Sequence, residues 1–184
     1  METNKNSYYD SFTVLGKFFY DVTLKWARFL AKHRILYYIL TYTWGILTSL
    51  FGLLLSLILV IVGKHPEGYY WIYFFRVGGD YWGGFSAGST FLRDKKSNDA
   101  AMNQHEFGHT FQNTLLGPFA IFMCYIPSII RYWTRTYAMK KNKSLKAYDA
   151  IWFEASATDA GAEATKIIAI RELAKAVRKD STWK

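Results

Sequence analysis

The chain has little of what stabilises a small secreted or fibrous fold. It contains one cysteine, Cys124, so neither an internal disulfide nor a cysteine-based zinc ribbon can form. Three prolines and the lack of internal repeats exclude collagen-like, low-complexity and solenoid folds. What remains is a chain of 184 residues that is 51% hydrophobic and 19% aromatic, which is too apolar for a disordered protein and suits one domain with an appended segment.

Acidic residues are also scarce. There are 14 of them against 23 lysines and arginines, so the net charge is +9. The basic residues flank apolar, aromatic blocks, and this arrangement fits an anionic lipid membrane better than a nucleic acid. We therefore expect a lipid membrane as a partner and no nucleic acid.

The N-terminal segment, residues 1–34, is expected to form an amphipathic helix from residue 11 onward. Apolar residues recur there at spacings of three and four, at Phe12, Leu15, Phe19, Val22, Trp26 and Phe29 or Leu30. Basic residues fall between them, at Lys17, Lys25, Arg28 and Lys32. Such a helix could lie in a membrane interface or cover a protein core, and the sequence leaves both open.

Residues 35–62 carry no charge, and LTSLFGLLLSLILVIV stands at their centre. About 20 apolar residues cross a bilayer, so we expect a transmembrane helix at 35–63. Residues 115–133 are also apolar, but Pro118 and Pro127 divide them into a broken span, a re-entrant hairpin or a buried helix pair. Basic residues before the first span place the N-terminus in the cytoplasm, and we interpret 115–133 as a shallow hairpin near that side.

The remaining segment, 64–184, is expected to form a domain that combines helices with a small β-ribbon. Residues 69–77 predict one strand and 82–92 a looser one, with a turn at Gly78-Gly79. A helix should begin near Ser97, Asn98 or Asp99 and end before Gly117-Pro118, and a long helix should cover 144–179 with Gly161 as its weak point. The predicted fold class is mainly α and integral to the membrane.

Residues 105–109 read HEFGH and carry the chemistry. On a helix, His105 and His109 lie one turn apart on the same face, so both imidazoles can bind one Zn²⁺ ion. Glu106 is rotated by about 100°. It is therefore predicted to act as a general base on a water that the metal activates, rather than as a ligand.

A catalytic zinc site needs a third protein ligand, and no histidine follows His109. Cys124 lies in an apolar run and is expected to be a packed thiol. Six carboxylates remain downstream: Asp149, Glu154, Asp159, Glu163, Glu172 and Asp180. Glu154 is favoured because it is the single carboxylate on a face of small residues, formed by Ala147, Ala150, Ala157, Gly161 and Ala164, which lets another helix approach closely.

HExxH with a downstream helical glutamate resembles the gluzincin arrangement of zinc metallopeptidases. The longer strings HEFGHTFQNTLLGP, IPS and YDAIWFEASATDAG resemble small bacterial membrane proteins that carry HEYGH-T-x-Q, LGP and a later E-x-x-A-x-x-x-G. The resemblance covers about residues 80–165. It implies His105, His109 and Glu154 as metal ligands and Glu106 as the base. Several gluzincins orient a ligand histidine with an aspartate four residues after the glutamate; here that position is Thr158, and the aspartate is Asp159.

Together these features predict a membrane-bound zinc metallopeptidase that hydrolyses a protein or peptide substrate. It would reside in the bacterial inner membrane, either multi-pass or single-pass with a re-entrant segment. A strand within 85–92 could pair with the substrate main chain, and Tyr148 could donate a hydrogen bond to an oxyanion. Two alternatives stay open: a membrane metal-binding protein without hydrolysis, and a structural or interaction protein with a decayed site. The oligomeric state is not set by the sequence.

Overall fold

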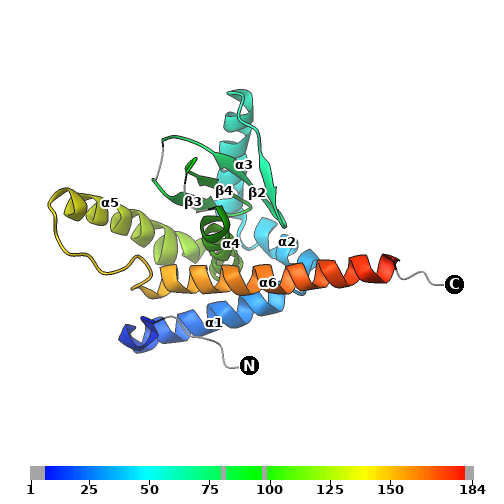
Figure 1. Cartoon of the computed structure of the whole chain (residues 1–184), viewed down its shortest axis with the longest axis horizontal. Helices are drawn as coiled ribbons and strands as arrows, with labels where there is room; N and C mark the ends of the chain where they lie inside the picture. Colours follow the sequence, from blue (N-terminus) through cyan, green and yellow to red (C-terminus); the bar gives the residue numbers. More distant parts are fainter. Residues whose placement is uncertain (1–6, 80–81, 97–98, 181–184) are drawn as a thin grey trace.

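Helices dominate this computed structural model, which describes residues 7–79, 82–96 and 99–180 (Figure 1). A short 3₁₀ turn, η1 (Tyr9–Ser11), precedes the first α-helix, and a small four-stranded mixed sheet packs on one side of the helices. The prediction of a mainly helical fold with a small β element is confirmed.

Helix α1 (Val14–Leu30) begins at Thr13, whose hydroxyl accepts a hydrogen bond of 3.1 Å from the Gly16 N–H. The helix is shorter than predicted, because the chain breaks before α2. The predicted face is partly wrong. Of the predicted stripe, Leu30 is buried, Phe12, Phe19, Val22 and Trp26 are half-buried, and Leu15 and Phe29 are exposed. The most buried face instead carries Gly16, Tyr20, Thr23, Leu24, Ala27 and Leu30, and this helix packs mainly on α6.

The uninterrupted helix expected over residues 35–63 is wrong. The chain forms α2 (Arg34–Tyr42) and α3 (Ile46–Ile61), which meet at an angle of 87°. The break has a packing cause: a Cβ at Gly45 would lie 2.3 Å from the Asn113 amide nitrogen, so only glycine fits there. Buried Thr41, Thr48 and Ser49 give this corner a polar inner side, and the Ser49 hydroxyl donates to the Thr41 carbonyl at 2.8 Å.

The sheet has four strands, not the two of the predicted ribbon: β1 (Glu67–Tyr69), β2 (Ile72–Arg76), β3 (Gly84–Ala87) and β4 (Thr90–Arg93). Their order is β1-β2-β4-β3, with β2 and β4 parallel and the other pairs antiparallel. The Gly78-Gly79 turn therefore opens a crossover rather than a hairpin. Stacked Phe74 and Phe91 rings, 5.0 Å apart, anchor the parallel pair to the core.

Helix α4 (Asp99–Leu116) carries HEFGH at its middle, as predicted. It ends at Gly117, whose φ of +55° suits glycine in the left-handed region. The predicted caps Ser97 and Asn98 lie outside the described residues. Within 115–133 the 3₁₀ turn η2 (Gly117–Phe119) and the π-helical turn η3 (Ile121–Tyr125) lead into α5 (Ile126–Lys140). The chain bends sharply here, as the prolines predict, and the shallow membrane hairpin stays a prediction. Pro127 occupies the first turn of α5, where proline is well tolerated.

Helix α6 (Trp152–Asp180) starts eight residues later than predicted and runs straight through Gly161, which is not a weak point. It lies between α1 and α4, so that it touches both (Figure 1). Its contact with α4 is a backbone contact. A Cβ at Gly108 would lie 1.8 Å from the Ala157 carbonyl oxygen, and a Cβ at Gly161 would lie 1.7 Å from that of Gln104. The predicted seam of small residues is confirmed for Ala157, Gly161 and Ala164, where it sets the separation of the two helices. Ala147 and Ala150, also predicted to belong to it, precede α6 and are not buried.

Replacing Gly161 with alanine is expected to destabilise the protein and weaken metal binding together. Alanine would favour the helix by about 1 kcal/mol. The Cβ would, however, collide with main-chain atoms that cannot step aside, and overpacking of this kind costs about 1–3 kcal/mol or more. Thermal unfolding and metal content measure the two effects. Ala169→Gly, at an exposed position of α6, should lose only about 1 kcal/mol and keep its metal. An unchanged melting temperature for Gly161→Ala would contradict the close contact.

Within the described residues, no single helix is long and apolar enough to cross a membrane. Two bent pairs meet the criteria of length and composition: α2 with α3, and residues 100–119 with 121–140, bent by 117°.

Candidate metal centre

The three predicted ligands come together where α4 meets α6. His105 and His109 project from consecutive turns of α4, and Glu154 stands in the first turn of α6. Their Nε2 atoms are 3.2 Å apart, and each faces the same oxygen, Oε2 of Glu154, at 3.2 Å from His105 and 3.4 Å from His109. The three side chains form a group that could hold a metal ion.

The size of this triangle suits zinc. In a tetrahedral site with bonds of about 2.0–2.1 Å, two ligand atoms lie about 3.3–3.4 Å apart. All three edges of the triangle are close to that value. The Glu154 Oε2 atom is fully buried and accepts no well-formed hydrogen bond, so it lacks the partner that a buried carboxylate oxygen needs. Two imidazoles and one carboxylate of this geometry fit a metal with one open position.

The tautomer of His109 is set by Gln112, one turn further along α4. The Gln112 amide nitrogen donates to the Phe153 carbonyl at 2.6 Å and to the Ser156 hydroxyl at 2.8 Å, so its oxygen is the atom that faces His109. That oxygen lies 2.7 Å from Nδ1 of His109 and can only accept. Nδ1 therefore carries a proton, so that a metal ion in the triangle would bind the Nε2 lone pair of the neutral ring.

His105 is held from α6. Its Nδ1 atom lies 2.9 Å from the hydroxyl of Thr158. This contact leaves Nε2 as the ring atom that faces the triangle.

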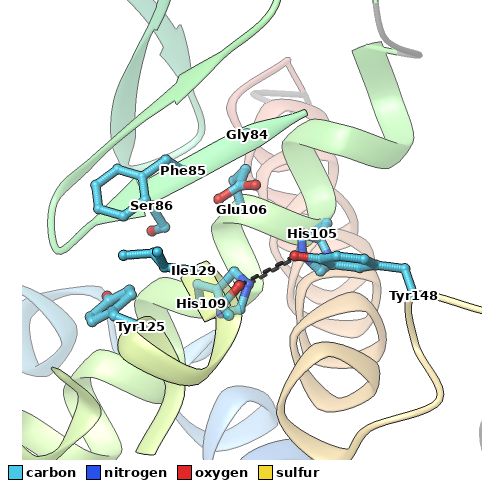
Figure 2. A pocket seen from close by; sticks show the side chains of 10 residues that line it. Gly84, Phe85, Ser86, His105, Glu106, His109, Tyr125, Ile129 and Tyr148 are labelled. Carbon is cyan, nitrogen blue, oxygen red and sulfur yellow. Dashed lines mark hydrogen bonds between the residues drawn. The ribbon is translucent and has the colours of Figure 1, made fainter. Parts of the chain in front are cut away.

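Glu154 is limited to one ligand oxygen. The Ser128 hydroxyl of α5 donates to its Oε1 atom at 2.6 Å, which leaves Oε2 for the histidines and the metal. Because the serine has a single hydrogen, its oxygen accepts the 3.2 Å bond from the Tyr148 hydroxyl. Tyr148 lies over His105, with ring centroids 6.0 Å apart (Figure 2). Its predicted role at an oxyanion stays a prediction.

Glu106 turns away from the triangle towards strand β3, as its position on the helix predicts (Figure 2). It lines a cavity of about 30 Å³ together with both histidines, and this volume suits one or two waters. Its Oε2 atom is buried without a hydrogen-bond partner. Burial raises the pKa of the Glu106 carboxyl, against the opposite influence of His105 and His109, and a raised pKa suits a base that works near neutral pH.

Strand β3 makes room for this carboxylate at Gly84, where a Cβ would lie 2.2 Å from Oε1 of Glu106. Among the described strands, β3 is an edge strand of the sheet. The substrate-pairing strand predicted within 85–92 is therefore partly wrong, because β4 is paired on both sides. The end of β3 is also covered, since the Ala87 carbonyl packs on Gly52 of α3. Only the stretch around Gly84 and Phe85 faces the cavity.

A second, larger cavity of about 590 Å³ adjoins the site and shares Gly84, His105, Glu106 and Tyr148 with it. Its apolar walls come from the segment before β3, from α4 and from α5, through Trp82, Met102, Tyr132 and Met139. It is large enough for side chains of a bound peptide.

Several other candidates lie outside the triangle. Asp159, which could have oriented a ligand histidine, instead accepts a 2.5 Å hydrogen bond from the Tyr20 hydroxyl. Glu163 pairs with Arg28 of α1. Cys124 is buried among apolar side chains, as predicted.

Three residues of the site carry a role that the sequence did not predict: Gln112, Ser128 and Thr158. The sequence contained a signal for two of them. Gln112 is part of the HEFGHTFQ string and stands three residues after His109, within reach on the same helix. Thr158 occupies the position where several gluzincins carry the orienting aspartate, and here its hydroxyl makes that contact. Ser128 comes from a separate helix, and only the fold brings it to Glu154.

Comparisons with known proteins give no relative. No protein-family model, no curated protein and no solved structure matches this chain. The function therefore has to be argued from the site.

Proposed function

We propose that this protein is a membrane-bound zinc metallopeptidase in which Glu106 is the general base. One observation carries the proposal: two histidines, held by Gln112 and Thr158, and one oxygen of Glu154 form a triangle of zinc dimensions. The open side of this triangle borders the cavity that holds the buried Glu106. A protein that only stored metal would have no use for an unpartnered carboxylate beside the open position.

The reaction follows from these positions. A bound zinc ion would supply a Lewis acid that polarises a carbonyl and makes a water more acidic. Glu106 accepts the proton of the attacking water, because its raised pKa lets it take up and later release that proton to the leaving amine. Gln112 and Thr158 hold the imidazoles still during the reaction, which costs no reorganisation since both contacts exist beforehand.

A peptide in extended form fits the surroundings of the site. The accessible part of β3, at Gly84 and Phe85, can pair with the main chain of a substrate at the edge of the sheet. The large cavity then accepts side chains beside the reacting bond.

Membrane attachment is supported by the surface of α3. Its large apolar side chains are exposed along most of its length, with Leu50, Phe51, Leu54, Leu57 and Ile58 each 50–57% accessible. A patch of this size is unusual on a water-exposed surface. The α2–α3 pair is bent, yet its length and composition suit insertion in lipid. The inner membrane of bacteria and the cytoplasmic side of the site stay predictions.

Removal of the metal tests the proposal directly. Detergent-extracted protein should hydrolyse a fluorogenic peptide. With 1,10-phenanthroline the rate should fall to background, and added zinc should restore it, because two of the three ligand atoms are imidazole nitrogens with zinc geometry. The isomer 1,7-phenanthroline does not chelate and should leave the rate unchanged. Hydrolysis that survives when the measured metal content is near zero would refute the proposal.

A further inference from the structure

Helix α5 and the turns before it carry an exposed apolar stripe that no other described segment covers. Large side chains recur at spacings of three and four, at Phe119, Phe122, Ile126, Ile130, Trp133 and Tyr137, which we term the outer stripe. Each is at least 42% exposed, and Trp133 reaches 70%. No residue of α5 is buried, so this helix contributes little to the core.

The opposite side of α5 belongs to the site. Ser128 donates to Glu154, and Arg131 donates to the Tyr148 carbonyl at 2.9 Å. Tyr132 and Met139 line the large cavity. One side of α5 thus contacts the site. The opposite side, which carries the outer stripe, is left free for a partner.

The charge around the stripe has one sign. Between Glu106 and Asp149 the chain has no acidic residue, whereas it has six basic ones: Arg131, Arg135, Lys140, Lys141, Lys143 and Lys146. The two arginines bind main-chain carbonyls of residues 146–148. The four lysines, which we term the lysine cluster, are exposed, and no carboxylate of the described residues pairs with them. The cluster therefore complements an anionic surface.

We propose that α5 docks on an anionic lipid surface, with the outer stripe in the acyl region and the lysine cluster among the headgroups. The order of residues along the chain supports lipid as the partner. The phenylalanines and isoleucines come first, Trp133 and Tyr137 follow, and the lysines come last. This gradient from apolar through aromatic to basic matches the depth profile of a bilayer. The inference rests on the membrane-bound part of the proposed function but not on its peptidase chemistry.

Membrane contact would then fix the position of α5, which forms one wall of the site. The helix that lies on lipid also carries Ser128, which limits Glu154 to one ligand oxygen, and Tyr132 and Met139, which bound the large cavity. A substrate would reach the site along the membrane surface.

Single-cysteine labelling tests the docking. Ile130→Cys and Tyr132→Cys place an environment-sensitive fluorophore on opposite sides of α5, at positions of similar exposure, while buried Cys124 stays unlabelled in the wild-type chain. The full chain is reconstituted in vesicles of phosphatidylcholine with phosphatidylglycerol. Quenching by brominated acyl chains should be at least about twofold stronger at position 130 than at 132. Trp133→Cys provides a second outer position should Ile130→Cys fold poorly.

The lysine cluster gives a second readout. Each lysine near an anionic membrane changes the partition of a protein segment between water and membrane about fivefold. The triple variant Lys140→Gln, Lys141→Gln and Lys143→Gln should therefore reduce quenching at position 130 towards the level in vesicles of phosphatidylcholine alone. Equal quenching at 130 and 132, or a water-exposed label at 130 and 133, would overturn the docking. If the label is already shielded from water in detergent and the protein sediments as a dimer, the outer stripe binds a second copy of the chain instead. Flotation of the wild type with vesicles tests membrane attachment itself, independently of α5.

Discussion

Glu106→Gln is expected to abolish peptide hydrolysis while the protein keeps its zinc. The amide has nearly the shape of the carboxylate but cannot accept the proton, and a general base contributes about 10²–10⁴-fold to a rate. Glu106 is not part of the ligand triangle, so metal content should equal that of the wild type. The measurement pairs turnover of a fluorogenic peptide with zinc analysis of the same sample.

The stability of this variant gives an independent check. Burial raises the pKa of Glu106, which means that the charged form is costly in the folded protein. A neutral amide avoids this cost, so the variant should be at least as stable as the wild type above about pH 5, where the unfolded carboxyl is ionised. An inactive variant with a lower melting temperature would point to misfolding, and an active one would assign the base to another residue.

Glu154→Gln should lower zinc affinity by more than a hundredfold. Loss of a residue that only orients a metal ligand lowers metal affinity about 10–100-fold. Glu154 would supply one of the three ligand atoms and also a negative charge, so its loss should lower the affinity further. The side chain is fully buried, and its amide would still fit beside Ser128. Competition with a fluorescent zinc chelator measures the affinity.

Glu163→Gln is the matched control, nine residues along the same helix. It breaks the ion pair with Arg28 of α1, a loss of about 1 kcal/mol or less for a half-exposed pair, but leaves the ligand triangle intact. Zinc affinity should therefore stay at the wild-type value. Similar losses in both variants would mean that Glu154 acts on the fold rather than on the metal.

The grouping of the three candidate ligands could be predicted because its signals are local. The spacing of His105 and His109 places them on one helix face, and Glu154 is the lone carboxylate on a face of small residues. Close backbone packing at Gly108 and Gly161 then brings that face against the histidines. Composition also indicated the helices and a small β element.

The rest depends on contacts between distant segments. The corner at Gly45 exists because Asn113, 68 residues away in sequence, occupies the space of a side chain, and hydropathy along the chain does not register this. The parallel pairing of β2 with β4 needs a crossover connection. The turn signal at Gly78-Gly79 predicts only that the strands on either side of it pair directly with each other. Ser128 meets Glu154 solely because the bend after α4 brings the start of α5 to the first turn of α6.

The position of α6 between α1 and α4 has a consequence for biosynthesis. Helix α1 packs mainly on α6, so it leaves the ribosome long before its main neighbour is made. Both histidines emerge before Glu154 and, until α6 docks, they can offer a metal only two nitrogens. A nascent chain cut short anywhere before α6 would be a weak metal binder without hydrolytic activity. On the proposed function, hydrolysis would thus arise only in a chain whose helical layers have closed.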